Sequence, residues 1–387
     1  MLKLILSLTL ILSVALCAVP VSAGAEGSLR LLAVNVGKAD ALLLFSGEDT
    51  YLIDTGTAES WPMLQRALKV QGVTRLTGVI LTHTHKDHTG GAWALAQSDI
   101  EIDHWYASAY YSEVKEKKHP AVLAAALRGQ EVEWLRGGDE LPLDGARLTA
   151  LGPLEYTDVE NCNSLVLLAE GGGGTMLLTG DMEFPEEQAL MDAGLIEHFT
   201  VLKVGNHGNP DATLDSFAAL VAPDVAVIST DSTVDTNTPS KRVLKALMAT
   251  GSQVAVTQNA AQGVEVILQG GSASAVLLPW PDTLPAAESG VLLRELSIED
   301  DSITLYNSGS EAVDLSGWTI FSTKGKETFV FPEGASIAPG AALTVTGLSA
   351  EVQGDYQWPD KKLWNKKEED IAQLYDSWGW LVSELSN

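Results

Sequence analysis

The chain has 387 residues, enough for two or three domains with a large buried core. Its 51 acidic residues outnumber the 24 basic residues, which gives a formal net charge of −27. A surface with this charge repels phosphate backbones, so the composition argues against stable DNA binding by the chain as a whole.

Residues 1–23 have the pattern of a secretory signal peptide. Lys3 precedes an almost wholly apolar run over residues 4–19, and the small residues Val21-Ser22-Ala23 follow. We expect cleavage after Ala23. An uncleaved anchor is the alternative, although the run is short for a membrane span of about 20 residues. No later run is long and apolar enough to span a bilayer, so we expect a secreted or cell-surface protein without a transmembrane domain after cleavage.

Residues 28–279 alternate short apolar runs with segments of helical spacing. The spacing predicts helices over residues 61–70, 121–127, 185–191 and 241–248. It predicts strands over residues 29–36, 41–45, 51–53, 79–82, 164–168, 176–179, 225–229 and 264–268, with a hairpin turn at 171–174. This mixed order favours an α+β domain in which two sheets lie between helices.

The stretch His83-Thr84-His85-Lys86-Asp87-His88 follows the apolar run 78–82 and precedes Gly90-Gly91. That context is typical of a buried strand that ends in a loop. Histidine and aspartate are ligands for divalent ions such as zinc or manganese. Four such side chains exceed the needs of one open catalytic site, so the spacing indicates two ions. A solvated polar loop is the alternative, and it is disfavoured because three of only seven histidines fall here.

This motif resembles the metal signature of the metallo-β-lactamase superfamily, whose fold is an αββα sandwich. Asp54, after the strand 51–53, resembles the superfamily's first motif, in which an aspartate orients the metal-binding histidines from behind. Gly180-Asp181 resembles the motif whose carboxylate bridges two ions, and His207 resembles the last metal ligand. The Asp-Thr-Gly and Gly-Asp sequences are also ordinary turn formers. Here, however, all four motifs occur in the order and spacing that the superfamily has.

Within that superfamily, residues 34–41, 161–167 and 203–208 resemble the ComEC-like competence hydrolases. The resemblance implies that His83 and His85 hold a first ion with help from Asn161. It implies that Asp87, His88 and His207 hold a second ion and that Asp181 bridges the two. Asp87 and Asp181 are the candidate catalytic residues, because either carboxylate could steer a metal-activated hydroxide. Asn161 stands where many relatives have histidine, and its oxygen suits manganese better than zinc.

Several further polar residues have two open interpretations. Asp40 lines the site or supports a turn, and Lys203 neutralises a substrate oxyanion or is a solvated strand lysine. Asn206 stands where the ComEC pattern usually has another histidine, which puts help with proton transfer in doubt. We interpret His104 and His119 as surface residues, and Cys162 as a buried inert thiol that forms no internal disulfide.

The Pro-rich segment 280–290 is interpreted as a linker. Beyond it, residues 291–387 have short β-rich runs that predict a small immunoglobulin-like sandwich. The predicted strands are 292–298, 302–307, 319–322, 328–331 and 342–345. Residues 303–307, 313–318, 329–334 and 337–340 resemble the lamin-tail domain, in which we expect Trp318 to be a core anchor rather than a binding-surface aromatic.

These observations predict a secreted hydrolase with two divalent ions, zinc or manganese. Its most favoured reaction is phosphodiester hydrolysis, with extracellular nucleic acid or a phosphorylated envelope polymer as substrate. Two alternatives stay open: hydrolysis of another ester or amide bond, and a cell-surface binding or scaffold protein whose metal site is structural or vestigial. β-Lactam hydrolysis is disfavoured because β-lactamases usually lack a histidine at the position of His88. We expect a cell-envelope or polynucleotide ligand for the C-terminal domain.

Overall fold

The computed structural model describes residues 27–387, except 115, 289, 361 and 366. The predicted signal peptide, residues 1–23, lies outside the described residues. Within the described part of the chain, no helix is long and apolar enough to cross a membrane.

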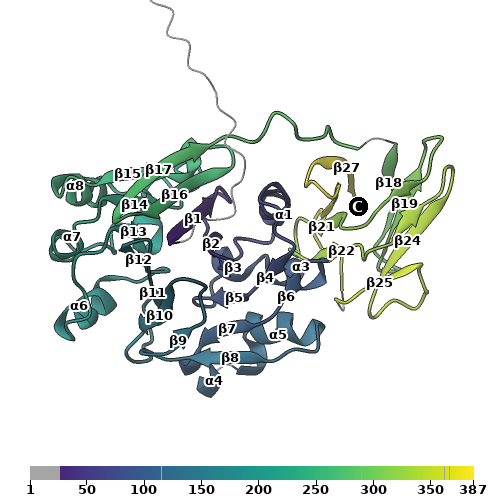
Figure 1. Cartoon of the computed structure of the whole chain (residues 1–387). Coiled ribbons are helices and arrows are strands. Elements are labelled where there is room, and N and C mark those ends of the chain that lie inside the picture. Colours follow the sequence, from purple (N-terminus) through teal and green to yellow (C-terminus); the bar gives the residue numbers. More distant parts are fainter. Residues whose placement is uncertain (1–26, 115, 289, 361, 366) are drawn as a thin grey trace, which may run out of the picture.

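Two large sheets make up residues 28–278 (Figure 1). The first sheet has the strand order β17-β16-β1-β2-β3-β5-β7-β8, with bounds Ser272–Leu278, Gly263–Gln269, Ser28–Val34, Leu42–Ser46, Asp49–Ile53, Gly78–Leu81, Trp105–Ser108 and Val132–Leu135. The second sheet has the order β15-β14-β13-β12-β11-β10-β9, with bounds Gln253–Val256, Val225–Ile228, Val201–Lys203, Gly174–Leu178, Val166–Gly171, Arg147–Gly152 and Glu140–Leu141. A further short pair joins β4 (Arg75–Leu76) to β6 (Glu101–Ile102).

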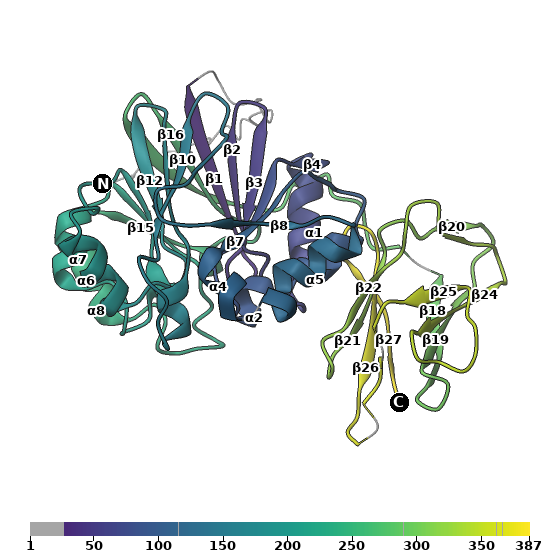
Figure 2. The ribbon, with the colours of Figure 1, turned by 90° about the horizontal axis from the view of Figure 1, so that it is seen from below.

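The two sheets pack face to face between two layers of helices (Figure 2). Alternate residues of both sheets, such as Leu44, Ile80 and Leu178, form the core between them. The outer face of the first sheet is covered by α1 (Trp61–Val70), α3 (Ala92–Gln97) and α5 (Pro120–Leu127). The outer face of the second sheet is covered by α6 (Phe184–Asp192), α7 (Asp215–Val221) and α8 (Lys241–Ala249). The expected α+β sandwich of αββα layers is therefore confirmed.

Parallel pairing determines where the site can form. β3, β5, β7 and β8 are parallel neighbours in the first sheet, and β12, β13, β14 and β15 are parallel neighbours in the second. Loops that follow parallel strands emerge at the same edge of a sheet. The loops after β3 and β5 of the first sheet carry Asp54 and His83, and those after β12 and β13 of the second sheet carry Asp181 and His207. The fold therefore brings the separate motifs to the same edge of the two packed sheets.

The sequence predicted the four longest helices of this region, but it missed several strands. α1 is confirmed over residues 61–70, with Trp61, Leu64 and Leu68 buried at helical spacing. β7 and β8 were not predicted, since each has four residues and is recruited by parallel pairing rather than by a local hairpin. The predicted strand 164–168 begins only at Val166, because residues 160–163 form a 3-10 turn.

Residues 291–387 form a second, smaller unit of β-strands. Its main sheets are β18-β19-β24-β25 (Val291–Ser297, Ser302–Asn307, Ala342–Gly347, Tyr356–Trp358) and β22-β21-β26-β27 (Thr328–Val330, Thr319–Ser322, Ile371–Tyr375, Leu381–Ser386). A short pair, β20 (Val313–Asp314) and β23 (Ser336–Ile337), completes it. Trp318, Trp358 and Trp364 are buried in the shared core. The predicted β-sandwich is confirmed, and Trp318 is a core anchor.

The β-sandwich packs directly on α1 of the αββα unit (Figures 1 and 2). The buried side chain of Arg66 donates hydrogen bonds to the carbonyl oxygens of Trp378, at 2.8 Å, and Gly379, at 2.7 Å. Its guanidinium also lies 3.5 Å from the ring centroid of Trp380. Gly379 has a φ of +71°, and a Cβ atom there would lie 2.1 Å from the carbonyl oxygen of Pro62. The turn that meets α1 therefore depends on glycine and on Arg66.

Replacing Arg66 with alanine is expected to destabilise this contact by about 3 kcal/mol, because it leaves a buried carbonyl group at Gly379 and a partly buried one at Trp378 without a charged donor. The measurement is thermal unfolding combined with limited proteolysis of the segment 280–290. Arg147→Ala, which removes an exposed arginine of the αββα unit, is the control. Equal melting and cleavage behaviour for the two variants would contradict a role for Arg66 in holding the β-sandwich.

Candidate metal centre

The first group of candidate ligands consists of His83, His85 and Asp181. One ligand atom from each side chain lies within 4.8 Å of the others. His83 Nε2 and His85 Nδ1 are 3.1 Å apart. On the opposite side of its ring, His83 Nδ1 lies 3.2 Å from the hydroxyl of Ser164, which also accepts a hydrogen bond from the Asp181 amide. The turn after residue 163 thus connects two of the three ligands.

The second group consists of Asp87, His88, Asp181 and His207. His88 Nε2 lies 3.1 Å from Asp181 Oδ2, and His207 Nε2 lies 3.3 Å from the same oxygen. His207 Nε2 also lies 3.4 Å from Asp87 Oδ2. Asp181 therefore belongs to both groups, which is the arrangement that a bridging carboxylate requires.

The histidines of the second group are oriented by acceptors behind their rings. His88 Nδ1 lies 2.7 Å from Asp54 Oδ2, and Asp54 accepts hydrogen bonds from the amide and the hydroxyl of Thr82, both at 2.8 Å. The Ser229 carbonyl accepts from His207 Nδ1 at 2.8 Å. Such contacts direct each Nε2 lone pair toward the centre. Asp54 lies in the supporting position that the sequence predicts.

The backbone around His207 is unusual. Asn206 and His207 have φ values of +43° and +54°, in the left-handed region that non-glycine residues seldom adopt. At Gly205, a Cβ atom would lie 2.5 Å from the carbonyl oxygen of Met182. This tight turn after β13 places the ring of His207 against Asp181. Strained backbone of this kind is often kept at functional sites.

The donor set fits divalent cations. His88 Nε2, His207 Nε2 and Asp181 Oδ1 are buried and make no hydrogen bond with any described residue. Burial alone would lower the pKa of His207, but the facing carboxylates of Asp181 and Asp87 outweigh it and raise this pKa to about 9. The cluster therefore attracts positive charge. Bound ions would supply that charge and displace the imidazole protons.

Lys203 is fully buried, so its interpretation as a solvated strand lysine is wrong. Its ammonium forms an ion pair with the buried carboxylate of Asp40 and donates to the Gly180 carbonyl at 2.8 Å. It also lies 3.9 Å from Asp181 Oδ1. Lys203 therefore balances the charge of Asp40. It lies next to Asp181, the carboxylate shared by both groups, but it is buried and does not face solvent.

Asn161 and Asn206 are joined by a residue that sequence reasoning missed. Glu183 Oε1 accepts hydrogen bonds from Asn161 Nδ2, at 2.6 Å, and from Asn206 Nδ2, at 2.9 Å. The other amide atom, Asn161 Oδ1, is buried and has no partner among the described residues. The contact with Glu183 therefore leaves the oxygen of the Asn161 amide, rather than its nitrogen, without a partner among the described residues. The position of Glu183, two residues after Asp181, was the only available signal.

Replacing Glu183 with alanine is expected to weaken binding of the first ion by about 10- to 100-fold, the range typical of residues that orient metal ligands. Isothermal titration of the metal-free protein with manganese measures this effect. Glu183→Gln keeps one acceptor oxygen and should retain more affinity. Glu197→Ala, at an exposed position outside the site, is the control. Unchanged manganese affinity in Glu183→Ala would contradict the orienting role.

The remaining candidates lie outside both groups. His104 is exposed, as predicted. His119 is fully buried, so its prediction as a surface residue is wrong. Its Nδ1 atom accepts a hydrogen bond from the Ala121 amide at the start of α5, and its ring packs against Tyr111 and Trp134. Cys162 is buried, and burial raises the pKa of its thiol, as expected for an inert cysteine.

Two family models match the chain. The model of the metallo-beta-lactamase superfamily matches residues 34–232, and the model of the Lamin Tail Domain matches residues 285–387. The first match contains every candidate metal ligand. The second covers the whole β-sandwich. The predicted resemblances are therefore confirmed for both parts of the chain.

Curated relatives include competence proteins. "ComE operon protein 3" of Bacillus subtilis is 30% identical over 234 residues, which cover 55% of this chain and 30% of the relative. "Competence protein ComA" of Neisseria gonorrhoeae is 28% identical over 198 residues, which cover 50% of this chain and 26% of the relative. The chain thus spans less than a third of these relatives. Among solved structures, Zn(2+)-bound PqqB from Methylobacterium extorquens is 13% identical, with a TM-score of 0.43 over 62% of this chain and 99% of that one.

Proposed function

This chain belongs to the metallo-beta-lactamase superfamily, and we propose from this premise that it is a secreted phosphodiesterase that uses two divalent ions, zinc or manganese. A metal-dependent hydrolase is the activity class that the superfamily match supports. The observation that carries the proposal is the sharing of Asp181 between two groups of ligands. We assign the hydrolase to residues 28–279 and the lamin-tail domain to residues 291–387, joined by the linker 280–290.

The proposed ligand sets are those predicted from the sequence. His83, His85 and Asn161 would hold the first ion, Asp87, His88 and His207 would hold the second, and Asp181 would contact both. When bound, two such ions polarise a phosphoryl oxygen and lower the pKa of water toward neutrality. The side chains that hold the ions also orient the substrate, and Asp87 orients the attacking water.

Exposure indicates the side from which substrate approaches. His88, Asp181 and His207 are buried, whereas His85 is exposed and the Asp87 side chain is 27% exposed. This exposure supports an entry route for substrate beside His85 and Asp87. Asp87 is the carboxylate best placed to orient an attacking water, because it is both near the centre and accessible. Its pKa is held low despite partial burial by the facing imidazoles of His207 and His88, so it is ionised at neutral pH.

The choice of a phosphodiester rests on the chemistry of two ions and on similarity to proteins named for competence. Two cations can neutralise charge on both non-bridging oxygens during an in-line displacement. The same centre would also hydrolyse an ester, thioester or amide. A structural role for the metal site is the remaining alternative, and the exchange of imidazole for Asn161 is the feature that favours it.

The test is hydrolysis of bis(p-nitrophenyl) phosphate by the mature protein, first stripped of metal and then supplied with manganese or zinc. We expect turnover that depends on metal and is lost in His85→Ala. His104→Ala replaces an exposed histidine outside the site and should retain activity. Turnover of a chromogenic thioester or β-lactam, without turnover of the phosphodiester, would contradict the substrate class. Tightly bound metal with no turnover of any substrate would favour the scaffold alternative.

A further inference from the structure

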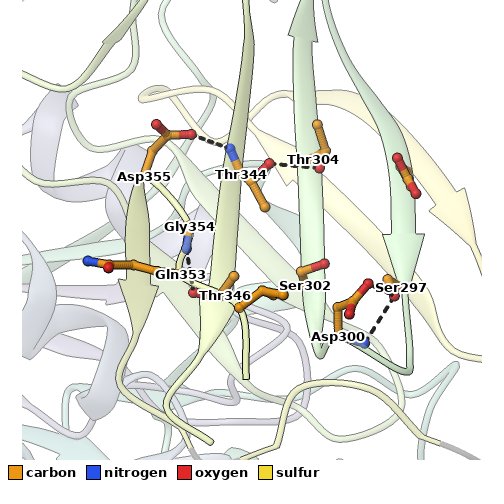
Figure 3. A pocket seen from close by; sticks show the side chains of 11 residues that line it. Ser297, Asp300, Ser302, Thr304, Thr344, Thr346, Gln353, Gly354 and Asp355 are labelled. Atoms are coloured by element: carbon orange, nitrogen blue, oxygen red, sulfur yellow. Dashed lines mark hydrogen bonds between the residues drawn. The ribbon is translucent and has the colours of Figure 1, made fainter. Parts of the chain in front are cut away.

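The β-sandwich carries a polar pocket on the face of β18, β19 and β24 that points away from its core (Figure 3). The pocket has a volume of about 490 Å³. The sheet forms the floor of the pocket, and the segment Val352–Asp355 forms a wall beside β24. It is far along the chain from every candidate metal ligand, and the proposed hydrolysis makes no use of it.

The floor of the pocket is a regular array of short polar side chains. Strand register places Thr304 between Glu295 and Thr344 in one row. It places Ser302 between Ser297 and Thr346 in the next row. Side chains alternate between the faces of a strand, and the intervening Ile303 and Val345 are buried in the core. The sheet therefore presents a flat surface of hydroxyl groups with almost no apolar side chains.

One of these hydroxyl groups has no partner. Thr304 and Thr344 pair through their hydroxyls at 2.9 Å, and the Thr346 hydroxyl accepts from the Gly354 amide at 3.3 Å. Ser302 is only 7% exposed and lines the pocket, yet its hydroxyl makes no hydrogen bond with any described residue. This hydroxyl is not among the fully buried side-chain atoms that lack a partner, so it reaches the open space of the pocket. Ser302 thus offers a donor and an acceptor to a molecule in the pocket.

The charged lining residues define the chemistry of that molecule. Glu295, Asp300 and Asp355 are exposed carboxylates around the pocket, and no lysine or arginine is among its described lining residues. Such a site repels phosphates and other anions. Carboxylates and hydroxyls together accept hydrogen bonds from neutral hydroxyl groups. The lining therefore disfavours anions and offers hydrogen-bond acceptors to a polyhydroxylated ligand.

The same face continues along β19 to an aromatic side chain. Tyr306 follows Thr304 by two residues, so it lies on the same face, where it borders a neighbouring shallow pocket with Leu292 and Arg294. The Arg294 guanidinium lies 4.8 Å from the centroid of the Tyr306 ring. From Ser302 to Tyr306 the strand extends roughly 13 Å, long enough for more than one sugar ring. The Arg294 guanidinium lies over one face of the partly exposed Tyr306 ring, so Tyr306 offers a sugar only the part of the ring that Arg294 leaves uncovered.

We propose that this surface, the outer face of β18, β19 and β24 from Ser302 to Tyr306, binds a chain of uncharged sugars. Glu295, Asp300 and Asp355 would accept hydrogen bonds from sugar hydroxyls, and Ser302 and Thr304 would contact the ring facing the sheet. The lamin-tail domain would then attach the secreted protein to a polysaccharide, whatever bond the metal centre hydrolyses.

The test is isothermal titration of the full mature protein with four probes: a chitin hexasaccharide, a cellulose hexasaccharide, a single-stranded oligonucleotide and oligolysine. We expect one of the two hexasaccharides to bind. We expect Glu295→Ala and Thr304→Val each to weaken that binding by about tenfold, the loss typical of one hydrogen bond that involves a charged or buried group. Glu333→Ala, an exposed glutamate of the same domain outside the pocket, should bind as the parent does.

The proposal is overturned if neither hexasaccharide binds, or if sugar binding is equal in the parent and in both pocket variants. Binding of oligolysine that is lost in Glu295→Ala would instead assign the pocket to cationic peptides. Binding of the oligonucleotide that is lost in either variant would assign it to nucleic acid. Circular dichroism of each variant separates loss of binding from loss of folding. Phosphodiester turnover, measured in parallel, should be the same in all variants.

Discussion

Replacing Lys203 with methionine is expected to lower the free energy of unfolding of the metal-free protein by about 3–5 kcal/mol, the usual result of removing one partner from a buried ion pair. Lys203 is fully buried, and its ammonium pairs with Asp40. Burial alone would lower the pKa of Lys203, but the carboxylates of Asp40 and Asp181 outweigh it and raise this pKa. The lysine therefore stays charged, and methionine would leave Asp40 buried without its counter-charge.

Urea denaturation at neutral pH, after removal of metal, measures this effect. Lys245→Met, at an exposed position of α8, should change stability by less than about 0.5 kcal/mol. In the double variant Asp40→Asn/Lys203→Met no unpaired charge is left, so it should recover part of the loss. A Lys203→Met protein as stable as the parent would show that Asp40 is neutral or hydrated, and the proposed charge balance behind the site would be wrong.

Replacing Asp181 with asparagine is expected to have the largest effect on the metal centre. Asp181 is the carboxylate that both groups of ligands share, and it lies within 3.3 Å of His88 Nε2 and His207 Nε2. Residues that only support a ligand already contribute 10- to 100-fold to metal affinity. Loss of the shared ligand should therefore weaken metal binding by at least about 100-fold and abolish turnover of the phosphodiester.

Two measurements separate metal loss from catalytic loss. Metal content by mass spectrometry should fall from two ions per chain in the parent toward one or none in Asp181→Asn. Turnover should not recover when excess manganese restores occupancy, because asparagine cannot supply a bridging anion. Asp192→Asn, at an exposed position of α6, is the matched control. Two tightly bound ions and full turnover in Asp181→Asn would refute the bridging role.

The sequence by itself was enough to identify the metal-ligand motifs, because each motif lies within a few consecutive residues. His83, His85, Asp87 and His88 follow one apolar strand, and their spacing indicates metal binding without knowledge of the fold. Asp54, Asp181 and His207 also follow short apolar runs. The alternation of strand-like and helix-like segments favoured two sheets between helices, and the resemblance of the motifs implied the αββα sandwich. The lamin-tail strands were also predicted from local pattern, since they are short β-rich runs bounded by turn residues.

Only the tertiary structure decided what each isolated polar residue does. Lys203, His119 and Glu183 have neighbours that are distant in sequence or belong to another loop, and nothing in their local pattern distinguishes a buried, paired side chain from a solvated one. The pocket around Ser302 and the contact of Arg66 with the β-sandwich arise in the same way. Hydrophobic periodicity records which face of an element is buried. It does not record which polar group of another element lies opposite, because that depends on how the sheets and helices pack.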